Sequence, residues 1–86
     1  MTTLFENLLD NSIELIRQSL PKDHEIDDVA WSETDDLFQI PVFDVSAFPG
    51  TQVDRFRFNR WRDETDEECG ERWQREINAF NNSWIG

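Results

Sequence analysis

The sequence predicts a small α+β domain over residues 1–86, with two helices packed on one face of an antiparallel hairpin or three-stranded sheet. Three observations lead to this fold class. Apolar residues recur at helical spacing near each end of the chain, two apolar β-type stretches lie between them, and a turn separates those two stretches. Because each element has an apolar side, burying these sides together produces two layers. A chain of 86 residues has room for one such core.

The first helix is predicted over residues 3–19. Thr3 and Glu6 have the spacing of a capping box, and apolar residues follow at steps of three and four. The polar run 10–12 leaves open a kink or a second N-cap in the middle. Pro21 ends the helix, because proline disfavours the helical conformation in the residue before it.

The next sixteen residues are polar and rich in turn formers. We expect a loop over 21–28, a short strand over 29–31 and a turn over 32–36. His24 stands between two carboxylates in this loop, and we expect a solvated side chain rather than a ligand or a switch.

A β-hairpin is predicted from 37–45 and 52–61, joined by a turn that contains Pro49-Gly50. Pro41 lacks the N–H that a central strand donates, so we expect either an edge strand with this position facing outward or a bulge there. In the returning strand, alternation places Phe56 and Phe58 on the face that packs against both helices, and arginines on the other face.

The second helix is predicted over residues 65–81. Thr65 and Glu68 repeat the capping-box spacing, and an apolar stripe follows at steps of four, four, three and four: Cys69, Trp73, Ile77, Phe80 and Trp84. Acidic residues in its first turn complement the helix dipole. The only cysteine, Cys69, is expected to be a small buried thiol.

Charge is distributed unevenly along this acidic chain, whose net charge is −11. Residues 55–62 contain Arg55, Arg57, Arg60 and Arg62, half of the eight basic residues, interleaved with aromatic side chains. Such interleaving is typical of single-stranded nucleic-acid binders, but the acidic balance opposes binding to phosphates. We therefore expect internal counter-ions, and an arginine-rich protein interface as the alternative. The expected partners of these arginines are Asp44, Asp54, Asp63 or Glu64.

The sequence carries no signature of an enzyme, a metal site or a cofactor. One Cys and one His cannot supply the usual metal-ligand spacings, and nothing near His24 or Cys69 would activate a nucleophile. The N-terminus lacks the basic start and apolar stretch of a signal peptide, and no apolar run approaches the roughly 20 residues of a membrane span. We expect a cytoplasmic, non-enzymatic protein that contacts neither membrane nor nucleic acid.

The density of acidic charge leads to the first functional hypothesis. A domain of this length is roughly 30 Å across, over which duplex DNA carries about 18 charges, and this chain has 19 carboxylates. We expect an inhibitor that occupies the basic nucleic-acid-binding site of a partner protein, as DNA mimics of phages and mobile elements do. The expected contacts are Asp23, Glu25, Asp27, Asp28, Glu33, Asp35, Asp36, Asp66, Glu67 and Glu68.

The second hypothesis is an interaction module of the immunity-protein, antitoxin or subunit type. It would bind through an aromatic hot spot, because Trp and Arg dominate such sites, or pair the expected edge strand around Pro41 with a partner's strand. The candidate hot-spot residues are Trp31, Arg57, Trp61 and Trp84. Salt distinguishes the two hypotheses, since charge mimicry weakens at high ionic strength whereas an apolar contact does not.

Overall fold

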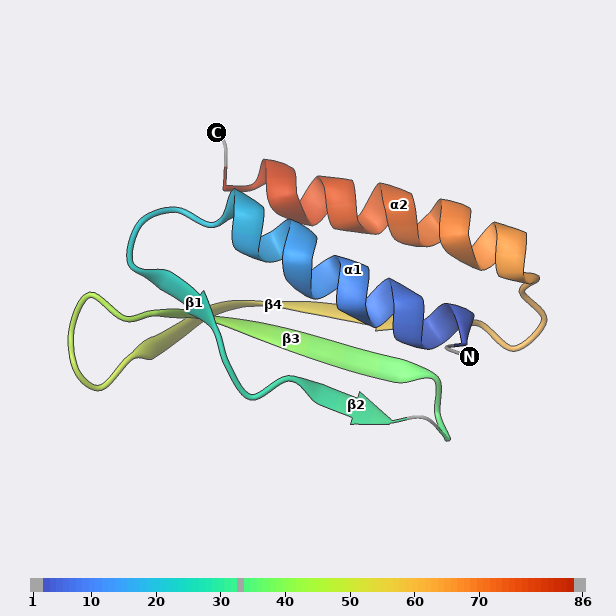
Figure 1. The fold of residues 1–86 in the computed structure, drawn as a ribbon, viewed down its shortest axis with the longest axis horizontal. Helices are drawn as coiled ribbons and strands as arrows, with labels where there is room; N and C mark the ends of the chain where they lie inside the picture. Colours follow the sequence, from blue (N-terminus) through green and yellow to red (C-terminus); the bar gives the residue numbers. More distant parts are fainter. Residues whose placement is uncertain (1–2, 33, 85–86) are drawn as a thin grey trace.

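The structure is a computed structural model that describes residues 3–32 and 34–84. Its elements are α1 (Leu4–Ser19), β1 (His24–Ile26), β2 (Ala30–Ser32), β3 (Leu37–Asp44), β4 (Thr51–Asn59) and α2 (Asp66–Asn82). The four strands form one antiparallel sheet, and both helices lie side by side on one face of it (Figure 1). The predicted two-layer α+β arrangement is confirmed, with one strand more than expected.

Both helices begin where the sequence predicts. The side chains of Thr3 and Thr65 accept the backbone N–H groups of Glu6 and Glu68, and each glutamate returns a bond to the backbone of its threonine. These capping boxes satisfy N–H groups that would otherwise lack partners in the first turn. The polar run 10–12 causes no break, and α1 is one continuous helix.

The strand that contains Pro41 is central, so the prediction of an edge strand is wrong. β1 pairs with the second half of β3 and β2 with the first half, on the same side, while β4 pairs along the other side. Proline is tolerated because it lies opposite the break at 27–29 between β1 and β2. The Pro41 carbonyl accepts the Asp27 N–H at 3.4 Å, so the proline nitrogen faces the same break, where no strand requires a donor.

A β-bulge is present, but it is not at Pro41. Val42 pairs with Asp54 and Phe43 pairs with Gln52, which leaves Val53 as an extra residue in β4. The bulge bends the sheet close to the turn between β3 and β4.

The segment predicted as a loop over 21–28 contains strand β1, so that prediction is also wrong. Only three residues form the strand, too few for a recognisable alternation. Its pairing with β3 and the packing of Ile26 against the core stabilise it. His24 is half-buried rather than solvated, and its ring packs edge-on against Trp84 at 5.6 Å between centroids. The short strand predicted over 29–31 is present as β2.

The core lies between the helix pair and the sheet. Phe38, Ile40 and Val42 of β3 are fully buried, and Phe56 and Phe58 of β4 pack beside them, which confirms the predicted helix-facing side of the hairpin. The apolar stripes of the helices cover these side chains with Phe5, Leu8, Leu9, Ile16, Cys69, Trp73 and Ile77. As predicted, the Cys69 thiol is buried in this core.

One buried hydrogen bond joins the helices and yields a test of their packing. The Trp73 indole N–H donates to Ser12 Oγ at 2.7 Å, and that hydroxyl donates to the Leu8 carbonyl. Ser12→Ala should leave the indole N–H without a partner and lower the free energy of unfolding by about 1 to 3 kcal/mol.

The double variant Ser12→Ala, Trp73→Phe removes both polar groups of this bond. In urea unfolding, its loss of stability should be smaller than the sum of the two single losses, because contacting residues couple. Strict additivity would show that the bond contributes nothing.

Candidate functional site

Six of the predicted acidic contacts follow one edge of the sheet. We call this group the acidic edge. It runs along β1, the break at 27–29, β2 and the turn into β3, on the side of β3 that faces away from β4. Its members are Asp23, Glu25, Asp27, Asp28, Asp35 and Asp36, all exposed except the half-buried Asp36. Glu33 lies outside the described residues.

Turns in the backbone position three of these carboxylates. Asp23, Asp28 and Asp36 have φ values of 63, 52 and 46°, in the left-handed region. Aspartate and asparagine are among the few residues other than glycine that tolerate this region, because their short polar side chains bond to local backbone. The acidic edge therefore consists of one strand position, Glu25, and of loop and turn positions, three of which favour Asp for backbone reasons.

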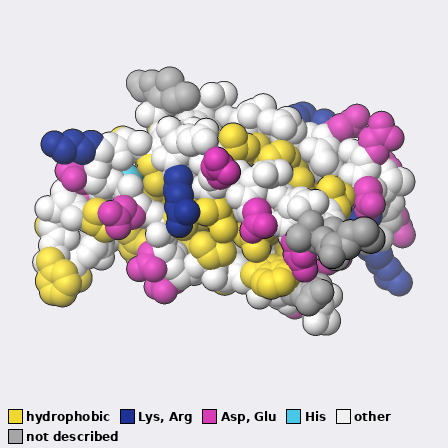
Figure 2. Space-filling view, viewed as in Figure 1, with side chains coloured by type: hydrophobic (Ala, Val, Ile, Leu, Met, Phe, Trp, Pro, Cys, Tyr) yellow, Lys and Arg dark blue, Asp and Glu magenta, His cyan; other side chains and the backbone are white. Residues whose placement is uncertain are grey.

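The predicted contacts at the start of α2 lie at one end of this edge. Asp66 forms an ion pair with Arg60, and both line a hollow together with Asp36 and the first residues of α1. Figure 2 shows acidic side chains along the whole of this face, including a group at the end of the molecule at which both helices begin. The Glu68 carboxylate is engaged in the capping box, whereas Glu67 is exposed. The structure thus brings Asp36 and Asp66 together, while Asp23 and Glu25 lie towards the far end of the edge.

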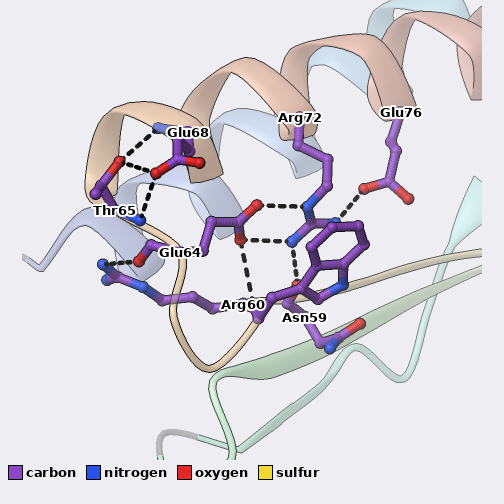
Figure 3. A network of polar contacts seen from close by, with 8 residues as sticks. Asn59, Arg60, Glu64, Thr65, Glu68, Arg72 and Glu76 are labelled. Atoms are coloured by element: carbon purple, nitrogen blue, oxygen red, sulfur yellow. Dashed lines mark hydrogen bonds and ion pairs between the residues drawn. The ribbon is translucent and has the colours of Figure 1, made fainter.

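The arginines of residues 55–62 are not paired as predicted. Glu64 binds Arg72 of α2 instead, at 2.7 and 2.9 Å, and Arg60 donates to the Glu64 carbonyl (Figure 3). Arg60 also forms an ion pair with Asp66. Arg55, Arg57 and Arg62 form no ion pair with any described residue.

Strand geometry explains why the predicted partners are not used. Asp54 pairs with Val42 and therefore lies on the helix side of the sheet, whereas Arg55 and Arg57 lie on the opposite side. The carboxylates of Asp54 and Asp44 bond to local backbone, accepting the N–H groups of Arg55 and Ser46. The side chain of Ser46, and after it the Ser46 backbone N–H, lower the pKa of Asp44.

Arg72, which the sequence analysis did not select, forms a buried polar centre. Its guanidinium donates to Glu64, to Glu76 and to the Asn59 carbonyl (Figure 3). The planar group also stacks over the rings of Phe58 and Trp61, at 4.4 and 4.3 Å from their centroids. Its spacing of three residues after Cys69 places it on the buried side of α2, and that spacing was the available signal.

Hydrogen bonds from Arg72 outweigh the cost of burying the Glu64 carboxylate. The side chains of Arg72 and Glu64 are 9% and 6% exposed, and the bonds from Arg72 hold the pKa of Glu64 down at about 2. The Glu64 carboxylate is consequently charged at neutral pH.

The four predicted hot-spot residues do not form one cluster. Trp31 lies on β2 at one edge of the sheet, 47% exposed, and Trp61 follows β4 at the other edge, 59% exposed. Trp84 is half-buried against Phe80 and His24 near the end of α2. Arg57 is exposed on the face of the sheet without helices. Trp61 borders a cleft of about 510 Å³, whose other lining residues are Arg62, Asp63, Glu64, Glu68, Glu71, Arg72 and Arg75.

Three further findings concern chemistry. Among residues 3–32 and 34–84, no group of three or more His, Cys, Asp or Glu side chains is arranged to hold a metal ion. None of the helices in this described part is long and apolar enough to cross a membrane. Burial raises the pKa of the Cys69 thiol, which keeps it protonated at neutral pH.

The Glu64–Arg72 pair predicts a specific pH dependence of stability. Because the folded-state pKa of Glu64 lies below its ordinary value of 4.5, the pair contributes stability above pH 4.5 that disappears as the pH falls towards 2. Glu64→Gln should lower the free energy of unfolding by about 3 to 5 kcal/mol at pH 7. In urea unfolding at several pH values, the difference in the free energy of unfolding between the unaltered chain and Glu64→Gln should decrease below pH 4.5. Glu67→Gln, at an exposed position, is the control and should change stability by less than about 0.5 kcal/mol.

Comparison of the chain with protein-family models, with curated proteins and with solved structures found no match in any of the three. What bears on function is therefore the layout of charge, the exposed aromatic groups and the strand edges of the chain itself.

Proposed function

We propose that this protein inhibits a partner protein by occupying its basic nucleic-acid-binding site. The observation that carries this proposal is the acidic edge, whose six carboxylates form no ion pair with any described residue. Their charge is therefore available to a basic surface. An intracellular nucleic-acid-binding partner agrees with the cytoplasmic location expected from the sequence. Such an inhibitor would serve a phage or mobile element in counter-defence.

The spacing of charge along this edge supports mimicry of a nucleic-acid strand. Asp23 bonds to Val45 and Asp36 immediately precedes Leu37, so the edge spans the length of β3. For the eight residues of β3, at ~3.3 Å each, this length is about 26 Å. One DNA strand carries a phosphate every ~3.4 Å, hence about eight over this distance. Six described carboxylates in the same length approach that density.

The acidic edge is a better candidate for contact than the start of α2. Asp66 is already paired with Arg60, and Glu68 is engaged in the helix cap. The partial positive charge of a helix N-terminus further offsets the carboxylates of the first turn. Along the edge, in contrast, the backbone that carries the carboxylates is set by the pairing of β1 and β2 with β3, so little backbone ordering entropy opposes binding.

Neutralising the edge without straining its turns tests the proposal. Asn tolerates left-handed backbone as Asp does, so the edge variant is Asp23→Asn, Glu25→Gln, Asp27→Asn and Asp28→Asn. The matched control changes four exposed carboxylates elsewhere: Asp10→Asn, Glu14→Gln, Asp63→Asn and Glu71→Gln. Affinity for the partner should fall at least ~30-fold in the edge variant, about 2 kcal/mol, and much less in the control.

The partner is identified by affinity capture from a lysate of the native host, at low and at high salt. The proposal requires that the captured protein wash off at high salt and that duplex DNA compete for it. Equal affinity of the edge and control variants would contradict the proposal, as would a partner that DNA cannot displace.

The exposure of Trp61 favours a second candidate, an interaction module with an aromatic hot spot. One side of the indole stacks on the buried Arg72, which fixes its orientation, and 59% of the residue remains exposed beside a cleft. Rigid, exposed tryptophans are typical of hot spots.

For this second candidate, Trp61→Ala should reduce affinity for the captured partner about 30-fold or more, at low and high salt alike. Trp31→Ala, at the opposite edge of the sheet, is the control and should have little effect. Urea unfolding of both variants verifies that the domain remains folded. If Trp61→Ala lowered the affinity only at low salt, the result would contradict an aromatic hot spot and favour charge mimicry.

A further inference from the structure

Among residues 3–32 and 34–84, β4 pairs with β3 alone, which leaves its outer side as a free strand edge (Figure 1). Along an antiparallel strand, the N–H and C=O of one residue point to the same side and successive residues alternate. The backbone carbonyl of Pro41 points towards β1. The backbone groups of its two neighbours, Ile40 and Val42, therefore point towards β4, where they lie opposite Phe56 and Asp54. The backbone groups of Arg55, Arg57 and Asn59 consequently point outward.

Two bonds within the chain close the ends of this edge. The Asp54 carboxylate accepts the outward N–H of Arg55 at 2.7 Å, and Arg72 donates to the outward carbonyl of Asn59. Between these bonds lie the Arg55 carbonyl, both backbone groups of Arg57 and the Asn59 N–H. No hydrogen bond joins any of these four groups to another described residue. We call them the β4 window.

The side chains at this window carry unpaired positive charge. Arg55 and Arg57 are exposed on the face of the sheet without helices, and neither forms an ion pair with a described residue. A strand added to β4 would place its own residues directly opposite these arginines, with side chains on the same face. Since the arginines are two residues apart, carboxylates at every second position of the added strand would oppose both.

A second copy of this chain does not satisfy these charges. The only carboxylate of β4, Asp54, lies on the other face of the sheet. No register of two β4 strands therefore sets a carboxylate opposite Arg55 or Arg57, and pairings centred on the window set arginine against arginine. Like charges in directly opposed positions disfavour pairing.

We propose that the β4 window binds an extended segment of a partner protein in which Asp or Glu occupies every second position, by strand addition. Backbone hydrogen bonds would provide affinity, and the alternating carboxylates would provide specificity. This surface is separate from the acidic edge, which lies across β3, and the proposal does not depend on the inhibitory function proposed above.

The test is an NMR titration of the isotope-labelled full chain with two eight-residue peptides of equal composition. In one peptide Thr and Glu alternate singly, and in the other pairs of Glu alternate with pairs of Thr, so that no two Glu lie two positions apart. The alternating peptide should bind about two- to fivefold more tightly, with amide shifts concentrated between residues 54 and 60. Replacing its Glu by Gln should weaken binding, which tests the charges without altering the protein.

Protein variants supply the matching control. Arg55→Gln with Arg57→Gln should weaken binding of the alternating peptide about fivefold, as expected for the loss of two cross-strand ion pairs. Arg62→Gln with Arg75→Gln changes net charge equally but leaves β4 intact, and should bind as the unaltered chain does.

Several results would overturn the proposal. Equal affinity of the two peptides would show charge attraction without strand pairing. Amide shifts confined to the residues of the Trp61 cleft would place the binding site there rather than at the β4 window. Tighter binding of single-stranded oligothymidylate at the same amides would assign the window to nucleic acid. Concentration-dependent shifts of these amides without peptide would assign it to a second copy.

Discussion

The buried guanidinium of Arg72 is the interaction on which the surface of this domain depends. It bonds to the end of β4, to the segment after β4 and to α2 itself, so it fixes the angle at which the second helix leaves the sheet. Because the ion pair with Glu64 is nearly excluded from water, losing one partner would leave an uncompensated buried charge. The same group supports the exposed ring of Trp61 and closes one end of the β4 window. Two of the candidate interaction surfaces thus share one structural anchor.

The sheet separates opposite charges across its width. Carboxylates follow β1 and β2, arginines lie on β4, and β3 stands between them. Two strand spacings of ~4.8 Å place these charges about 10 Å apart, close to the Debye length of ~8 Å at physiological salt. At that ionic strength each edge can attract its own partner with limited interference from the other. At low salt the strong net negative charge would weaken the attraction of an acidic segment to β4.

Pro41 connects the topology of the sheet to the shape of the acidic edge. A proline in a central strand requires one position at which no neighbour needs its N–H, and the break between β1 and β2 provides it. That break is also where Asp27 and Asp28 turn outward, the latter with left-handed backbone. The interruption that accommodates proline therefore exposes two adjacent carboxylates in the middle of the edge.

By itself, the sequence determined the two helices, their capping boxes and the helix-facing side of the hairpin, because local spacing and capping chemistry decide these features. Phe56, Phe58 and the apolar stripes of 3–19 and 65–81 were all assigned to the core correctly. Only the tertiary structure decided the partners of the charged groups and the order of the strands. Glu64 pairs with Arg72 rather than with an arginine of 55–62 because the turn between β4 and α2 places it beside the helix. Strand β1 forms only because β3 lies beside it. Contacts of this kind join residues whose proximity depends on the whole fold, so the periodicity of the sequence does not predict them.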